Sequence, residues 1–172
     1  MTRPQPNPGR FRRYRESGVC YFVTTNTHAR RPFFREGALA TIVLENLEFY
    51  QKRLDFRLNA FVVMPDHLHL LLVPGETSLS DIMRSLKSFS AKQIIEAVGG
   101  QGPIWQSRFH DRAIRCEDQF STAIEYIHQN PVRAGLSPNA EEYRYSSASA
   151  YAGLEQNGAP ALVHSDGSRL GP

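Results

Sequence analysis

Two histidines, a tyrosine and an asparagine in this chain have the types and spacings of a metal-assisted nucleophilic site. His67 and His69 lie two residues apart in an apolar segment with the composition of a strand, so their side chains point to the same side of a sheet. The two imidazoles can therefore share one divalent cation. Tyr126 and Asn130 lie four residues apart in a segment with helical periodicity, so they emerge together from a helix. If strand and helix pack, the phenol lies beside the cation.

Each of these residues also has a plainer interpretation. A pair of histidines on a strand is often only hydrogen-bonded, and a lone tyrosine more often packs half-buried than attacks a substrate. The surroundings of the pair favour metal binding, because imidazoles in a run of leucines lose hydration unless each nitrogen has a partner. A cation held by His67, His69 and Asn130 would supply that partner and keep positions open for a phosphate oxygen. Mg²⁺ or Mn²⁺ suits this Lewis-acid role better than a closed zinc site.

Other polar residues near these motifs have more open interpretations. Asp66 could orient one imidazole, and it could equally cap the turn that precedes the strand. We interpret His128 as a local hydrogen-bonding group, since it lies on a different part of the helix surface from Tyr126. His110 could touch a substrate, although a structural role is favoured. Cys20 and Cys116 have no paired spacing and are expected to be buried, reduced thiols.

The length and composition describe an ordinary globular chain. It has 172 residues, 41% of them hydrophobic and 22% charged, which is enough for one core. No apolar run approaches the roughly 20 residues that cross a bilayer. Residues 1–9 have no apolar stretch of the kind that secretory signals contain, so we expect a cytoplasmic protein.

The net charge of +3 is modest, and its distribution says more than its size. Guanidinium groups suit phosphates and aromatic rings suit unstacked bases, so a stretch that mixes them can hold single-stranded nucleic acid. A solvated basic leader is the alternative. The candidate DNA-binding residues before and just after the first expected strand are Arg10, Arg12, Arg13, Tyr14, Arg15 and Arg31.

Hydrophobic periodicity divides the chain into four strands and three helices. Strands are expected at residues 20–27, 56–64, 67–73 and 105–115, and helices at 37–54, 79–98 and 117–129, the last stopped by Pro131 and Gly135. In the second helix Phe89 is among the residues expected to face inward. The order predicts an α+β, ferredoxin-like fold: an antiparallel sheet of the split βαβ type with helices on one face, plus a C-terminal helix that carries the nucleophile. We divide the chain into a basic N-terminal extension (1–18), a catalytic domain (19–145) and a flexible C-terminal tail (146–172).

Two joint motifs, FVVMPDHLHLLL at residues 61–72 and YIHQNPVRAGL at 126–136, resemble those of the HUH single-tyrosine transposases. The similarity is closest to the REP-associated tyrosine transposases of bacteria. Further agreement comes from YFVTTNTHARRPFF at 21–34 and WQSRFHDRAIR at 105–115, so the resemblance runs from about residue 10 to residue 145.

The resemblance implies a role for each candidate residue. His67 and His69 would bind the divalent metal, Mg²⁺ or Mn²⁺, with Asn130 as third ligand, a position where related enzymes place a glutamine. Tyr126 would be the nucleophile. The implied activity is sequence-specific cleavage and rejoining of single-stranded DNA at REP-type hairpin repeats, through a 5′-phosphotyrosine and a free 3′-OH. The phosphotyrosine retains the bond energy, so no nucleotide cofactor is needed.

The resemblance also implies how the chain meets its substrate. The basic stretch before Val19 resembles an extension that is implicated in recognising a short guide sequence next to the hairpin. A monomer is favoured and a dimer is possible, since simpler insertion-sequence relatives are dimers. Two other functions stay open: a non-catalytic ferredoxin-like nucleic-acid-binding module, which would use exposed aromatic residues on its sheet, and an HUH nickase that initiates replication.

Overall fold

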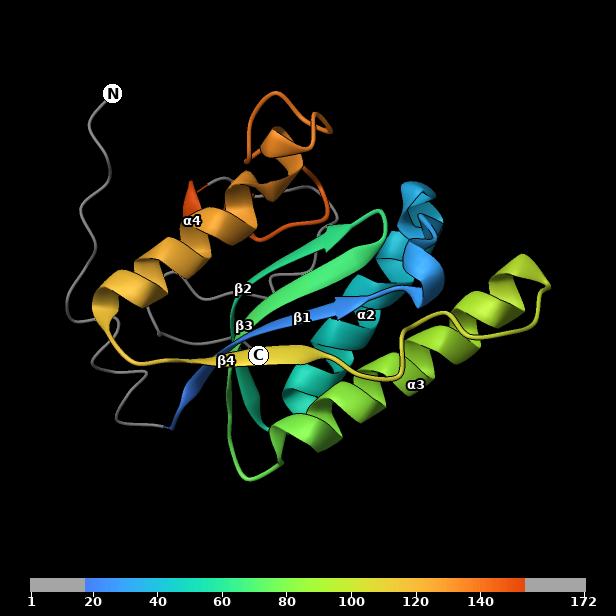
Figure 1. Cartoon of the computed structure of the whole chain (residues 1–172), viewed down its shortest axis with the longest axis horizontal. Helices are drawn as coiled ribbons and strands as arrows, with labels where there is room; N and C mark the ends of the chain where they lie inside the picture. The colour runs from blue at the N-terminus through green and yellow to red at the C-terminus, as the bar shows by residue number, and fades with distance from the viewer. Residues whose placement is uncertain (1–17, 154–172) are drawn as a thin grey trace.

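A four-stranded antiparallel sheet forms the centre of the part of the chain that the structure, a computed structural model, describes: residues 18–153. Its strand order is β2-β3-β1-β4 (Figure 1). The strands are β1 (Cys20–Asn26), β2 (Phe56–Met64), β3 (His67–Pro74) and β4 (His110–Ile114). The helices are η1 (His28–Arg30), η2 (Phe33–Arg35), α2 (Gly37–Arg53), α3 (Leu79–Val98), α4 (Glu117–Arg133) and α5 (Ala148–Tyr151). The predicted α+β fold with an antiparallel sheet is confirmed.

Helices cover both faces of the sheet. Helices α2 and α3 lie side by side on one face, and α4 crosses the opposite face (Figure 1). Strand β3 explains why both faces need cover, because Leu68, Leu70 and Leu72 pack in the core with α2 and α3 while Leu71 packs in the core with α4. By the same alternation His67 and His69 lie on the α4 face.

Helix α3 begins and ends as its sequence predicts. The Ser78 side chain accepts a hydrogen bond from the backbone N–H of Asp81 at 3.1 Å, and Gly99 ends the helix with φ of +60°. The prediction for Phe89 is wrong: its side chain is 54% exposed. The inward place belongs to Ser90, whose hydroxyl oxygen accepts a hydrogen bond from Trp105 Nε1 at 2.9 Å.

The fourth strand is shorter than predicted, because the segment from Trp105 to the start of β4 is a loop. Trp105 forms only an isolated bridge to Thr27, and its ring is buried in the core. The loop is held by Lys87, whose Nζ donates to the carbonyl oxygens of Ser107 and Arg108 at 3.1 and 3.3 Å. A side chain thus satisfies backbone groups that a strand would have satisfied through its neighbour.

Helix α4 is longer than predicted, because Pro131 lies inside its last turn and does not end it. A proline near the C-terminus of a helix removes one backbone hydrogen bond from the helix. The Pro131 ring is buried, so the removed bond is accompanied by burial of apolar surface. The helix ends at Arg133, two residues before Gly135, which is the second predicted stop and has φ of +68°. The N–H of Leu136 donates to the carbonyl oxygen of Pro131 at 2.9 Å. Arg133 therefore belongs to the same helix as Tyr126 and Asn130.

The predicted flexible tail begins with a packed segment, which corrects the boundary at residue 145. Backbone hydrogen bonds join Val63 N to Tyr145 O at 2.8 Å and Ser147 N to Phe61 O at 3.0 Å, so residues 145–147 extend along β2. The short helix α5 follows, and the folded region reaches at least Gly153. The rest of the proposed tail, residues 154–172, and residues 1–17 of the proposed extension lie outside the described residues.

Two smaller observations complete the fold. Cys20 is buried as expected, whereas Cys116 is exposed at the residue that precedes α4, so its predicted burial is wrong; both thiols are free. Within the described part of the chain, no helix combines the length and apolar character needed to cross a bilayer.

Candidate active site

The two histidines of β3 lie side by side on the face of the sheet that α4 covers. Their ring centroids are 4.7 Å apart. His69 is only 5% exposed, and His67 is half-buried. The strand therefore delivers both imidazoles to one place, as their spacing predicts.

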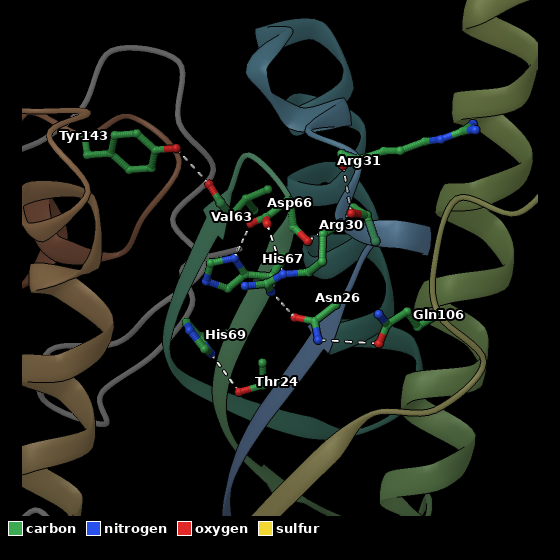
Figure 2. A network of polar contacts seen from close by, with 11 residues as sticks. Thr24, Asn26, Arg30, Arg31, Val63, Asp66, His67, His69, Gln106 and Tyr143 are labelled. Atoms are coloured by element: carbon green, nitrogen blue, oxygen red, sulfur yellow. Dashed lines mark hydrogen bonds and ion pairs between the residues drawn. The ribbon is translucent and has the colours of Figure 1, made fainter.

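Each imidazole is held through its Nδ1 atom by a different kind of partner. His67 Nδ1 lies 2.6 Å from Asp66 Oδ1, and His69 Nδ1 lies 2.8 Å from Thr24 Oγ1 (Figure 2). Asp66 is itself ion-paired with Arg30, with 3.2 Å between Oδ2 and Nε. Of the two interpretations of Asp66, the structure thus supports orientation of an imidazole. No spacing in the sequence relates Thr24 to His69, because only the β1–β3 register places the two residues opposite each other.

The Nε2 atom of His69 is buried and has no hydrogen-bond partner among the described residues. Burial lowers the pKa of His69 to about 3, with smaller contributions from the charges of His67 and Arg30. The imidazole is therefore neutral at physiological pH, which is the form that binds metal ions. An unpartnered buried nitrogen beside a second, oriented imidazole fits the donor set of a divalent cation.

Tyr126 on α4 lies next to His69 of this pair within the same chain. Its ring centroid is 5.4 Å from that of His69 and 5.8 Å from that of Phe22, a residue of β1. The side chain is 42% exposed, so the phenol can meet a ligand from solvent. The guanidinium carbon of Arg133 lies 5.5 Å from the Tyr126 ring centroid, two helical turns along α4.

Asn130 follows Tyr126 by one helical turn and is half-buried. Both residues flank the buried stripe of α4, in which Phe120, Ala123 and Ile127 pack against the sheet. Among residues 18–153, no three histidine, cysteine or acidic side chains gather where they could hold a metal ion. A complete ligand set would therefore need a donor of another type, such as the Asn130 amide.

The other two candidate histidines near the motifs differ in burial. His128 is buried, with Nε2 2.8 Å from Ser147 Oγ and its ring 4.7 Å from that of Tyr151. This agrees with the interpretation of His128 as a local hydrogen-bonding group. His110 is exposed at the start of β4, opposite Thr24 in the strand register.

Of the candidate DNA-binding residues, the structure describes Arg31. Its side chain is exposed after η1, and its carbonyl oxygen accepts a hydrogen bond from Thr27 Oγ1 at 2.7 Å. The other candidates, Arg10, Arg12, Arg13, Tyr14 and Arg15, lie outside the described residues.

Three further arginines contact residues of the candidate site: Arg30 pairs with Asp66, Arg133 lies against the Tyr126 ring, and Arg112 lies against the Phe22 ring. The guanidinium carbon of Arg112 is 5.9 Å from the ring centroid of Phe22. These arginines belong to η1, α4 and β4, so they come together only when the sheet forms.

Comparisons with known proteins find relatives of this chain among transposases. The family model described as "Transposase IS200 like" matches residues 17–130. The chain is 31% identical to the REP-associated tyrosine transposase of Escherichia coli (strain K12) over 139 residues, 80% of this chain and 81% of that protein. It is 26% identical to a Haemophilus influenzae relative (strain ATCC 51907 / DSM 11121 / KW20 / Rd) of similar name, over 80% of this chain and 84% of the relative.

The fold is also found among solved structures. A structure of a REP-associated tyrosine transposase bound to a REP hairpin has a TM-score of 0.67 and 24% sequence identity to this chain. The match covers 100% of this chain and 99% of the other.

Proposed function

The chain belongs to the IS200-like transposase family and, within it, to the REP-associated tyrosine transposases, and on this premise we propose that it cleaves and rejoins single-stranded DNA at hairpin-forming repeats with Tyr126 as nucleophile. The observation that carries the proposal is the closeness of the Tyr126 and His69 rings, 5.4 Å between centroids in one chain. A tyrosine that only packs in the core is normally buried, whereas Tyr126 is 42% exposed. A buried polar atom normally has a hydrogen-bond partner, whereas His69 Nε2 has none among the described residues.

His67, His69 and Asn130 would hold the divalent cation, which we propose to be Mg²⁺ or Mn²⁺. When bound, the cation would act as a Lewis acid that polarises the scissile phosphate. Asp66 and Thr24 hold the two imidazoles through their Nδ1 atoms, which leaves the Nε2 atoms for this role.

The proposed reaction exchanges one phosphodiester bond for another. The Tyr126 oxygen attacks phosphorus and loses its proton to water, while the bond from phosphorus to the 3′ oxygen breaks and that oxygen takes up a proton. The products are a 5′-phosphotyrosine and a free 3′-OH. Because the number of phosphoester bonds is unchanged, the reverse attack by a 3′-OH rejoins strands without a nucleotide cofactor.

We propose that the DNA strand lies over the half of the sheet that α4 leaves open. Helix α4 packs mainly on β2 and β3, while Phe22 of β1 is half-exposed and Arg112 of β4 is exposed. Arg112 lies against the Phe22 ring and Arg133 lies against the Tyr126 ring, an arrangement that suits phosphates and an unstacked base.

The matched transposase structure holds a REP hairpin, and we propose a hairpin of this class as the partner of this chain. The basic residues before Val19 would recognise a short guide sequence beside it. The closeness of Tyr126 to the histidines of its own chain favours action as a monomer. DNA as substrate favours the cytoplasm as compartment.

Incubation with a labelled hairpin oligonucleotide and Mn²⁺, followed by a denaturing gel, tests the proposal. Wild-type protein should yield a DNA band shifted by covalently attached protein, and Tyr126→Phe should yield none while its hairpin affinity stays within about threefold. Tyr21→Phe is the matched control, because Tyr21 packs with the core on the other face of the sheet. An adduct formed by the Tyr126→Phe protein would refute the assignment of the nucleophile.

A further inference from the structure

The two histidines are oriented by chemically different groups, and we infer that Thr24 is a positioning residue that fixes His69 in the tautomer with a free Nε2 lone pair. The inference rests on the proposed function only for its consequence, which is metal affinity. Its structural part concerns the protein without metal.

The position of Thr24 is set by the backbone. Thr24 on β1 is paired directly with His69 on β3, and both side chains lie on the α4 face. The Oγ1–Nδ1 distance is 2.8 Å. A β-branched side chain has few χ1 rotamers on a strand, so the hydroxyl is held in place before any ligand arrives.

The partner of His67 determines the tautomer of that histidine without ambiguity. A carboxylate accepts hydrogen bonds and cannot donate them, so the contact with Asp66 requires the proton on Nδ1 of His67. Arg30 keeps Asp66 in this role through its ion pair. In the neutral His67 imidazole, the form that binds a metal ion, the Nε2 atom is then left without a proton.

The hydroxyl of Thr24 could either donate to His69 Nδ1 or accept from it. The environment of Nε2 decides between these two arrangements. If Thr24 donated, the ring proton would lie on Nε2, where a buried N–H would have no acceptor among the described residues. If Thr24 accepts, Nε2 carries only a lone pair, and an unsatisfied acceptor is tolerated better than an unsatisfied N–H. The geometry thus favours a proton on Nδ1.

Both histidines then present proton-free Nε2 atoms to the same region, although one is oriented by a charged group and the other by a neutral one. The neutral partner suits the more buried site, because a second carboxylate beside His69 would itself need compensation for lost hydration. Thr24 can thus orient the buried imidazole without adding a charge.

Two substitutions separate the hydroxyl from the shape of Thr24. Thr24→Val keeps the branched shape and removes the hydroxyl, whereas Thr24→Ser keeps the hydroxyl and removes a methyl group. Loss of an outer partner of a metal-binding histidine typically weakens metal affinity 10–100-fold. We expect a loss of about that size in Thr24→Val and a change of less than about threefold in Thr24→Ser.

The experiment has two readouts on full-length protein. Long-range ¹⁵N–¹H spectra of metal-free, ¹⁵N-histidine-labelled protein report which ring nitrogen of His69 carries the proton, with His69→Gln to identify the signal. Titration with Mn²⁺, followed by electron paramagnetic resonance of the free ion, gives the affinity. Urea denaturation of each variant separates loss of fold from loss of orientation.

We expect the proton on Nδ1 in wild type and Thr24→Ser, and a shift toward Nε2 in Thr24→Val together with weaker Mn²⁺ binding. A Thr24→Val protein that keeps both the wild-type tautomer and the wild-type affinity would overturn the inference. So would a proton on Nε2 in the wild type. If the tautomers follow the expectation but His69→Gln binds Mn²⁺ as the wild type does, the positioning role stands and the proposed metal site fails.

Discussion

The hydroxyl of Ser147 joins α4, the helix that carries Tyr126, to strand β2 of the sheet. Removal of this hydroxyl should therefore lower the free energy of unfolding by more than substitution of an exposed serine does. Ser147 Oγ lies 2.8 Å from His128 Nε2 on α4 and accepts a hydrogen bond from Phe61 N on β2 at 3.0 Å. Ser147 is 2% exposed and His128 is 8% exposed, so water has little access to either group. Ser147→Ala would remove both contacts at once, together with the longer 3.4 Å hydrogen bond that the hydroxyl donates to the Phe61 carbonyl oxygen.

The expected size of the effect follows from these two contacts. A buried polar group that loses its partner destabilises the folded state by about 1–3 kcal/mol, so two such groups give roughly 2–4 kcal/mol after partial relaxation. For a folded unit of this size, 1 kcal/mol corresponds to about 2–4 °C in Tm, which predicts a decrease of roughly 4–16 °C.

Urea denaturation followed by circular dichroism measures the difference directly. Ser137→Ala is the control, because the Ser137 hydroxyl donates a solvent-exposed hydrogen bond to the nearby carbonyl oxygen of Asn139. We expect a change below about 0.5 kcal/mol. A Ser147→Ala protein within 0.5 kcal/mol of wild type would refute the view that this segment anchors α4.

Three further substitutions test the fold at separate places. Burial raises the pKa of the Cys20 thiol from 9.0 to about 12. As the pH rises, the unfolded chain therefore loses this proton before the folded protein does, and stability should fall between pH 9 and 12. Cys20→Ala should make that fall shallower by up to about 1.4 kcal/mol per pH unit, measured by urea denaturation at several pH values. A Cβ on Gly75 would overlap the carbonyl oxygen of Asp55, so Gly75→Ala should destabilise by about 1–3 kcal/mol in the same assay. Leu70 is fully buried, and Leu70→Ala should lower the unfolding free energy by about 2–5 kcal/mol.

Each of these has a result that would contradict it. A pH profile for Cys20→Ala that parallels the wild type would mean that the thiol does not keep its proton in the folded state. Unchanged stability in Gly75→Ala would mean that Gly75, in the turn after β3, does not approach the Asp55 carbonyl oxygen as closely as the structure shows. A loss under 1 kcal/mol for Leu70→Ala would argue against a tightly packed centre of β3.

The elements with the strongest local signals were predicted almost residue by residue. Strand β2 has the predicted bounds, β3 exceeds its prediction by one residue, and α3 begins after its Ser78 cap and ends at Gly99. These boundaries depend on turn residues and caps, which act over a few positions. Where a boundary depends on distant contacts, as for Pro131 in α4 or the loop after Trp105, the prediction was wrong.

The packed segment after Tyr145 shows the same limitation. Its serines and alanines are typical of a loose tail, and nothing local indicates that Ser147 bonds to the backbone of β2. The energy that orders this segment comes from residues far away in the chain, including His128 on α4. Composition alone cannot report such partners.

For the candidate site, the amino-acid sequence alone determined which residues share a side: His67 with His69 on a strand, and Tyr126 with Asn130 on a helix. These relations follow from the periods of the two backbone conformations, which are properties of a few consecutive residues. Only the tertiary structure decided that the phenol lies beside the imidazoles and that Thr24 stands opposite His69. The register of the strands and the position of α4 on the sheet result from burial of apolar surface that the whole chain contributes. No short segment of the sequence therefore determines them.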